Sequence, residues 1–124
     1  MIVSGVWPLV MNESEHREAP RIARSFLVRY RSLGNGPQAW LVSPLHDFSL
    51  HGARFMSERP FIVGDALELQ LVLPVVSQPV RLTAKVAWTK LGKLGLVEVG
   101  IIFDPVEAGI QQTLERAVNR FLHS

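Results

Sequence analysis

Cysteine is absent from the 124-residue sequence, which excludes a disulfide framework, thiolate metal ligands and a cysteine nucleophile. Long hydrophobic runs are absent too, because the apolar start, residues 1–11, is shorter than the about 20 apolar residues of a spanning helix. This start also carries no basic residue, unlike the charged beginning of a signal peptide. We therefore expect a cytoplasmic protein without membrane insertion.

Excess charge is likewise small, with a net charge of +2 at pH 7. That balance does not suit a general binder of long nucleic acids, so we expect no DNA or RNA polymer as a partner. The basic residues are unevenly spread, however, and five of the 13 lie between Arg17 and Arg31. A local positive patch of this kind suits a small anion better than a long polyanion.

The length indicates one domain, which is large enough for a hydrophobic core and too small for a second domain. We expect residues 1–14 to form a flexible tail and residues 15–124 to form this single domain. Whatever such a domain regulates must be another chain. A downstream protein is therefore expected as a partner, and the sequence does not identify it.

Most of the domain alternates apolar and polar residues with a period of two, the pattern of half-buried strands. The clearest case runs from Leu67 to Leu73, where leucines lie opposite Glu68 and Gln70. Six strands are predicted, at residues 26–31, 38–42, 52–56, 67–73, 80–88 and 97–103. Antiparallel strands that are apolar on one face are best closed into a barrel, which hides the sheet edges. The prediction is an all-β fold, a small six-stranded antiparallel β-barrel, with one C-terminal helix.

The C-terminal helix is predicted from a start signal and an apolar stripe. Asp104 is the expected N-cap, with Pro105 at the first helical position and Glu107 completing a capping box. Apolar residues then recur at helical spacing, namely Val106, Ile110, Leu114, Val118 and Phe121 or Leu122. This stripe should pack on the barrel, although part of it could instead serve as a partner surface.

An arginine-rich stretch, residues 17–24, precedes the first predicted strand, and we call it the arm. Pro20 lacks a backbone donor and biases the residue before it away from helical dihedrals, so the arm should be extended. In an extended chain Arg17 and Arg21 face one side and Arg24 faces the other. Two guanidinium groups on one side suit a ligand with phosphates and planar bases, above all guanine. Taken alone, these arginines also fit a solvated surface strand.

A second polar cluster, Asp47-Phe48-Ser49-Leu50-His51-Gly52, lies where one predicted strand leads into the next. If this segment is extended, Asp47 and Ser49 share a face, which places a carboxylate beside a hydroxyl. The carboxylate could accept hydrogen bonds from a guanine edge, and the hydroxyl could serve a base or a phosphate. Gly52 allows either turn dihedrals closed to other residues or the close approach of a ligand. Taken alone, the cluster also fits turn chemistry, in which Asp and Ser bond their own backbone.

Neither a metal site nor a catalytic centre is expected in this cluster. His51 shares a strand side with Asp47, but His46 does not, and no fourth metal ligand is evident. A nucleophile would need an elbow, an orienting third group and an oxyanion hole, and none of these is signalled. We therefore expect a protein that is not an enzyme and that holds no metal and no cofactor.

Together the two stretches resemble the PilZ family of bacterial cyclic di-GMP receptors. The arm supplies Arg-x-x-x-Arg, from Arg17 to Arg21, and the later cluster supplies Asp-x-Ser-x-x-Gly, from Asp47 to Gly52. Further stretches that are similar to this family's strands are Gly52-Ala53-Arg54-Phe55, Pro60-Phe61-Ile62-Val63-Gly64-Asp65, Val86-Ala87-Trp88 and Gly100-Ile101-Ile102-Phe103. The resemblance covers roughly residues 15–123, and both nucleotide motifs are complete.

The resemblance implies an effector whose ligand is cyclic di-GMP. Arg17 and Arg21 would hold phosphates and guanine faces or edges. Asp47 and Ser49 would take a guanine edge, and Gly52 would open the turn. Ligand binding would then order the arm against the barrel and change the surface that a partner protein meets.

Two further residues of the arm, His16 and Arg24, are possible secondary ligand contacts. Many members of the family carry a second arginine immediately before the first motif arginine, and His16 stands at that position here. This departure bears on how many nucleotides bind and how tightly. The alternative to a receptor is a PilZ-like adaptor that binds no nucleotide and acts through protein contacts in pilus, flagellar or envelope machinery.

Overall fold

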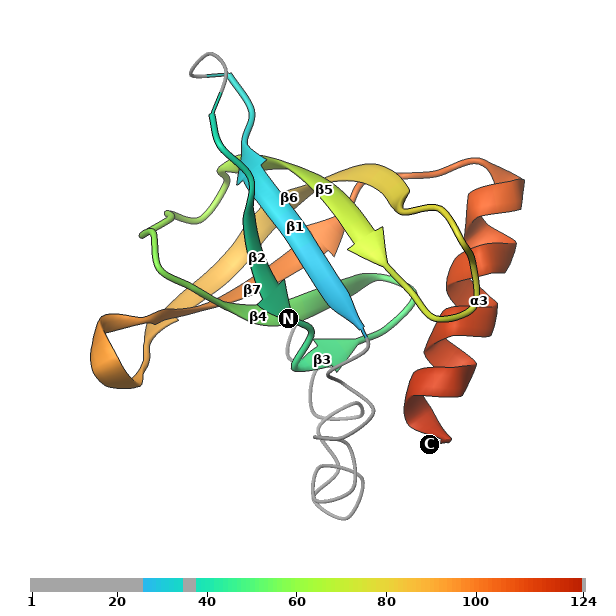
Figure 1. Ribbon diagram of the computed structural model, residues 1–124. Coiled ribbons are helices and arrows are strands. Elements are labelled where there is room, and N and C mark those ends of the chain that lie inside the picture. Colours follow the sequence, from blue (N-terminus) through green and yellow to red (C-terminus); the bar gives the residue numbers. More distant parts are fainter. Residues whose placement is uncertain (1–25, 35–37, 124) are drawn as a thin grey trace.

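A computed structural model describes residues 26–34 and 38–123, and in that part of the chain seven strands form one antiparallel sheet (Figure 1). The strands are β1 (Leu27–Ser32), β2 (Leu41–Pro44), β3 (Asp47–Phe48), β4 (Gly52–Ser57), β5 (Ala66–Val72), β6 (Val80–Leu91) and β7 (Val97–Phe103). A 3₁₀ turn, η1 (Lys93–Gly95), joins β6 to β7, and the helix α3 (Ala108–Leu122) follows the last strand. The predicted class, all-β with a C-terminal helix, is confirmed. The predicted tail, residues 1–14, and the arm lie outside the described residues.

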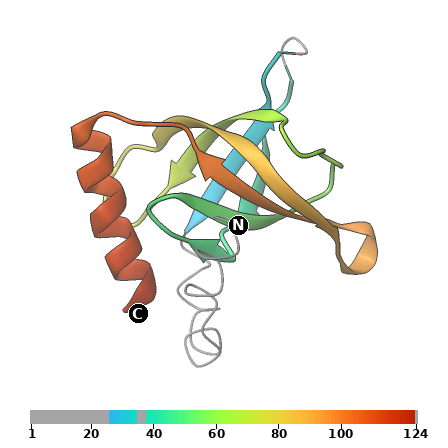
Figure 2. The same cartoon turned by 180° about the vertical axis from the view of Figure 1, so that it is seen from behind.

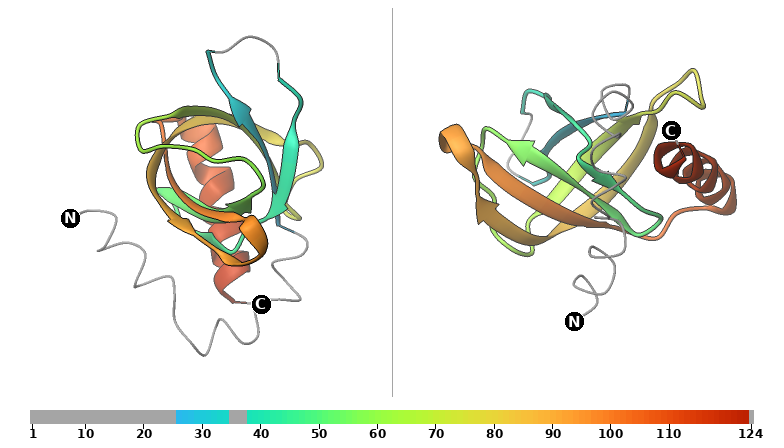
Figure 3. Two further views of the ribbon diagram at one scale, coloured as in Figure 1. Left: turned by 90° about the vertical axis from the view of Figure 1, so that its left-hand side faces the viewer. Right: turned by 90° about the horizontal axis from the view of Figure 1, so that it is seen from below.

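The sheet has the strand order β2-β1-β5-β6-β7-β4-β3 and curls into a half-barrel, as the end-on view of Figure 3 shows. The prediction of six strands is one short, because β3 has only two residues and is too short to show an alternating pattern. Strands β2 and β4 approach each other without forming a ladder. The Met56 amide donates to Ser43 Oγ at 3.4 Å, and the His46 amide donates to the Arg54 carbonyl at 2.8 Å.

The core forms where the period-two pattern predicts it. Leu67, Leu69 and Leu71 of β5 are fully buried, and so is Val28 of β1. Tyr30 is the largest buried side chain, and its hydroxyl donates to Ser57 Oγ at 3.1 Å. Burial raises the pKa of Tyr30, since the phenolate would lose its hydration. The core is therefore mainly apolar, and the hydroxyl of its one tyrosine is satisfied by a hydrogen bond.

The helix α3 begins three residues later than the start signal predicts. Glu107 occupies the N-cap position without a side-chain capping bond, so the predicted capping box is wrong. The Asp104 carboxylate instead accepts hydrogen bonds from Thr83 Oγ1 at 2.5 Å and from Lys85 Nζ at 3.3 Å, both on β6. These bonds hold the pKa of Asp104 below its usual value, with the bond from Thr83 as the main cause. The Asp104 side chain, which the local start signal assigns to the helix N-cap, therefore bonds β6 instead.

The apolar stripe of α3 packs on the half-barrel, as predicted. Leu114, Ala117 and Phe121 are buried, and four further stripe residues are partly buried against the core, namely Val106, Ile110, Val118 and Leu122. The Phe121 ring lies 5.1 Å from the Phe26 ring in an edge contact. Figure 2 shows the helix beside one end of the half-barrel. No helix in the described ranges is long and apolar enough to cross a membrane.

Different strand ends and connections lie at the two ends of the half-barrel. At the motif end, next to α3, lie the start of β1 and the turn between β3 and β4. At the opposite end, which we call the hairpin end, lie the end of β1 and the connections β4–β5 and β6–β7 (Figure 3). The strands between them fix this separation, since Leu27 at the start of β1 pairs with Val72 and Ser32 at its end pairs with Leu67.

Candidate functional site

Asp47 lies in a buried ion pair within the β3–β4 hairpin. It is directly opposite Arg54 in the antiparallel register, and Arg54 Nε donates to Asp47 Oδ2 at 2.9 Å. The two side chains are only 4% and 11% exposed. Arg54 Nη1 also bonds Glu98 of β7, which lies diagonally across the next strand pair. One arginine therefore joins two carboxylates, and the sequence-predicted Asp47 is neutralised inside the protein.

Ser49 organises the turn that follows Asp47. Its hydroxyl oxygen accepts hydrogen bonds from the backbone amides of His51 at 3.2 Å and Gly52 at 3.3 Å. The Ser49 amide in turn donates to the Gly52 carbonyl at 2.9 Å, which closes the hairpin. Ser49 therefore bonds the backbone of its own turn, which is one of the two roles that the sequence allows for it. Asp47, in contrast, bonds an arginine across the hairpin.

Gly52 is required by a close approach of the neighbouring strand. A Cβ at this position would lie 1.9 Å from the Ile101 carbonyl oxygen of β7. Turn dihedrals do not require the glycine, since Gly52 is not among the glycines with positive φ. The sequence left open whether Gly52 serves turn dihedrals or the close approach of another group. The structure shows a close approach, and the approaching group is the backbone of β7 and not a ligand. Gly52 thus lets the motif hairpin lie tightly against the sheet.

The chain enters β1 directly beside this hairpin. The Leu45 amide donates to the Phe26 carbonyl at 2.8 Å, and the Phe26 and Phe48 rings lie 6.3 Å apart. Phe26 is the first described residue of the domain, so the arm joins the described fold at the motif end. The structure brings together Asp47, Ser49 and Gly52 in one hairpin. The other candidates, His16, Arg17, Arg21 and Arg24, lie outside the described residues.

The sequence analysis did not predict the ion pairs that Arg54 forms with Asp47 and Glu98. Arg54 was noted only as part of a strand, although a hairpin turning at Ser49 to Gly52 places it opposite Asp47. That register is a usable signal, because cross-strand pairs of opposite charge stabilise each other. Glu98 gives no such signal, since its link to Arg54 spans 44 residues.

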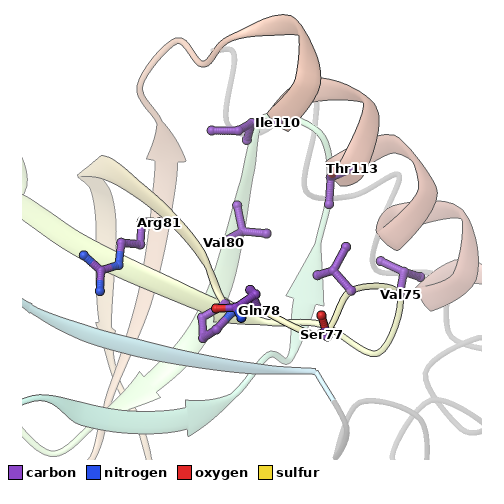
Figure 4. Close-up of a pocket in the computed structure, with 9 residues that line it drawn as sticks. Val75, Ser77, Gln78, Val80, Arg81, Ile110 and Thr113 are labelled. Atoms are coloured by element: carbon purple, nitrogen blue, oxygen red, sulfur yellow. The ribbon is translucent and has the colours of Figure 1, made fainter.

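The described residues also form an open groove that is separate from the motif (Figure 4). It has a volume of about 700 Å³ and lies between the β5–β6 connection and the first turns of α3. Its lining is mainly apolar and consists of Val75, Val76, Ser77, Gln78, Pro79, Val80, Arg81, Ile110 and Thr113. None of the motif residues lines it. In residues 26–34 and 38–123, moreover, no three His, Asp or Glu side chains are grouped to hold a metal ion.

The PilZ domain family matches residues 15–120, which include the arm, the motif hairpin and most of α3. The chain therefore belongs to the PilZ domain family, and the resemblance seen in the sequence is confirmed. A comparison with curated proteins finds no match.

Solved PilZ-domain structures share the fold. The inhibitor of motility MotI/DgrA of Bacillus subtilis superposes with a TM-score of 0.63 at 19% identity, over 80% of this chain and 48% of that protein. The PilZ domain of CeSA from a cellulose-synthesizing bacterium gives 0.57 at 16% identity, over 79% and 93%. The PilZ domain of Escherichia coli YcgR, solved with c-di-GMP, gives 0.58 at 15% identity, over 77% and 80%. The chain thus spans about half of MotI, and at these identities the likeness establishes the fold.

Proposed function

We propose that this domain is a cyclic di-GMP receptor in which the arm and the β3–β4 hairpin hold the nucleotide together. Membership of the PilZ family supports the proposal, as does the related fold of the YcgR domain solved with c-di-GMP. The observation that carries it is the backbone hydrogen bond between Phe26 and Leu45. This bond fixes the point where the arm joins the fold two residues away from Asp47.

Covalent geometry then limits how far the arm can reach from that point. An extended chain covers at most about 3.6 Å per residue, so Arg21 lies within about 18 Å of Phe26 and Arg17 within about 32 Å. A fold with β1 in the opposite direction would have delivered the arm to the hairpin end. In the observed direction, both motif arginines can meet a ligand that sits on the β3–β4 hairpin.

The arm and the β3–β4 hairpin offer complementary groups to the nucleotide. Arg17 and Arg21 would pair with the two phosphates and stack on the bases, because guanidinium groups bind oxygens bidentately and lie flat on rings. Asp47 would accept hydrogen bonds from a guanine edge. A carboxylate has about four acceptor positions, so Asp47 can keep its bond to Arg54 while it accepts further donors. Arm ordering on binding would change the surface presented to a downstream protein.

Calorimetric titration of the purified chain tests this function. Cyclic di-GMP should bind saturably, and cyclic di-AMP should bind at least about tenfold more weakly, since a site built for a guanine edge leaves its polar groups unpaired on adenine. The two nucleotides carry the same charge and the same ring, so they form a matched pair. Absence of binding to cyclic di-GMP would contradict the receptor function, and equal affinity would contradict the role of Asp47.

The second candidate is a PilZ adaptor that binds no nucleotide. One observation favours it, because Asp47 and Ser49 both have hydrogen-bond partners inside the protein. In an adaptor these residues would only shape the hairpin. The same titration separates the two functions, because a folded domain that does not bind cyclic di-GMP would exclude the receptor and leave the adaptor as the remaining candidate.

A further inference from the structure

The groove between the β5–β6 connection and α3 is not explained by the nucleotide site. Val75 and Val80 line one side of it, and Ile110 and Thr113 of α3 line the other (Figure 4). Its volume of about 700 Å³ falls in the range of about 300–1,000 Å³ that is usual for binding pockets. The lining is mainly apolar and contains no motif residue, so the groove suits an apolar occupant that is not the nucleotide.

The start of the chain, residues 1–11, is an apolar stretch that we call the apolar segment. It has no charged side chain, and eight of its 11 residues are apolar, namely Met1, Ile2, Val3, Val6, Trp7, Leu9, Val10 and Met11. Burial of one large apolar side chain contributes about 1.5–3 kcal/mol, and soluble proteins rarely leave large contiguous apolar patches in water. The apolar segment therefore gains free energy from any apolar surface within its reach.

The chain enters the described fold close to the groove. Leu27 at the start of β1 pairs with Val72 at the end of β5, and the groove-lining Val75 follows three residues later. Adjacent strands lie about 5 Å apart and a chain covers at most about 3.6 Å per residue, so Phe26 lies within about 20 Å of Val75. The stretch from Met11 to Phe26 can extend to about 54 Å. The apolar segment can therefore reach the groove of its own domain.

The charges beside the groove match those that follow the apolar segment. Arg81 lines the groove and is exposed, and Arg116 donates to a carbonyl of the groove wall at 3.1 Å. Neither arginine belongs to an ion pair of the described residues. Glu115 is also exposed on α3, but it is rotated by about 140° or more around the helix axis from the helix residues that line the groove. Glu13 and Glu15 come directly after the apolar segment and complement the two arginines.

Tethering favours the chain's own segment over a separate partner or a second copy. A segment joined to the same chain reaches an effective concentration of about 1 mM. A separate molecule present at about 1 μM would have to bind about a thousandfold more tightly to occupy the groove equally. Apolar character, reach and charge therefore all select an occupant that the chain itself supplies.

We propose that the apolar segment docks in this groove of its own domain, with Trp7 as the anchor. Trp7 is the largest apolar side chain of the segment, so it gains the most from burial. The arm then runs between two attachments, the groove and Phe26, and less conformational entropy is lost when it becomes ordered. The proposal does not rest on nucleotide binding, and its test contains no nucleotide.

The chain lacks cysteine, so two substitutions introduce two thiols and no others. Ser4→Cys, in the apolar segment, is combined with Ser77→Cys, in the groove wall. The intramolecular disulfide is measured in glutathione buffers and expressed as an effective concentration of the two thiols. The matched control combines Ser4→Cys with Val42→Cys. Val42 is 60% exposed and lies three residues before Leu45, whose amide bonds Phe26, so tethering alone brings position 4 within reach of both sites.

We expect the effective concentration to be at least about tenfold higher at position 77 than at position 42, because the buried Trp7 holds the segment in the groove. Trp7→Ser should lower the value at position 77 to that of the control and leave the control unchanged. Arg81→Glu should lower the value at position 77 several-fold, since it repels the glutamates that follow the segment. This second effect should weaken as salt rises.

Three results would overturn the proposal. Equal effective concentrations at positions 77 and 42 would show that the segment does not occupy the groove. An unchanged value at position 77 in Trp7→Ser would exclude Trp7 as the anchor. Disulfides that join two chains, together with a dimer in sedimentation velocity, would assign the groove to a second copy. The cyclic di-GMP titration is a separate measurement, so failure of this proposal and failure of the receptor function are distinguishable.

Discussion

Arg54 Nε lies 2.9 Å from Asp47 Oδ2, so the motif carboxylate of this PilZ domain is bonded to the adjacent strand of its own hairpin. The pair is nearly buried, and Arg54 also reaches Glu98 on β7. Two strand pairs are thereby connected through one guanidinium group. Asp47 consequently has a structural role in the hairpin in addition to the ligand role that we propose for it.

Replacement of Arg54 should therefore destabilise the domain strongly. Arg54→Met leaves the carboxylates of Asp47 and Glu98 without their buried cation, and removal of one partner of such a pair costs about 3–5 kcal/mol. Urea unfolding monitored by circular dichroism measures the loss. Lys85→Met is the matched control, because its pair with Asp104 is exposed and should contribute less than about 1 kcal/mol.

The double variant of Asp47→Asn with Arg54→Met provides the second half of this test. It removes the uncompensated charge at position 47, so it should recover part of the stability that Arg54→Met loses. A double variant as unstable as the sum of the two single variants would contradict the coupling between Asp47 and Arg54.

Gly52→Ala should destabilise the domain by more than about 2 kcal/mol, since its Cβ would collide with the Ile101 backbone rather than with a movable side chain. Gly109→Ala is the matched control, because no atom lies within 4 Å of that Cβ position and the residue is helical. Alanine there should leave the free energy of unfolding unchanged or raise it by up to about 1 kcal/mol. Thermal and urea unfolding measure both effects, and equal stability of the two variants would show that β7 does not require a glycine at position 52.

Asp104→Asn should lower stability at neutral pH and not in acid. The folded pKa of Asp104 is depressed, chiefly by the bond from Thr83, so its contribution is present above the ordinary carboxyl pKa of about 4. That contribution is lost as the pH falls through the lower, folded value. We expect the variant to melt roughly 2–5 °C below the wild type at pH 7 and to converge with it near pH 2. A difference of the same size in acid would contradict this account.

The sequence predicted the parts of the fold that local periodicity determines. Leucines at every second position located β5, and an apolar stripe located the face of α3 that packs on the half-barrel. The two-residue β3 was not predicted because it spans only one repeat of the two-residue pattern. The predicted helix start was wrong because the Asp104 carboxylate accepts a hydrogen bond from Thr83. Thr83 lies 21 residues earlier in the chain, so a local capping pattern does not predict this bond.

The candidate site was predicted in residue type and only partly in arrangement. The spacing of Asp47, Ser49 and Gly52 correctly placed them in one short segment, and the hairpin that joins them is observed. The contact of Arg54 with Glu98 depends on the pairing of β4 with β7, which no short stretch of sequence specifies. Long-range strand pairing, rather than composition, decides which charges meet.

Titration of Arg21→Ala with cyclic di-GMP tests the central claim most directly, because it removes one of the two arm arginines that would hold the nucleotide and lies outside the described fold. Each lost charge-assisted hydrogen bond contributes about 1.5–3 kcal/mol, so the affinity should fall about tenfold or more. Arg59→Ala, which removes an exposed arginine near the hairpin end, should bind as the wild type does. Wild-type affinity should also weaken as salt rises. Unchanged affinity of Arg21→Ala would contradict a receptor that holds its nucleotide between the arm and the β3–β4 hairpin.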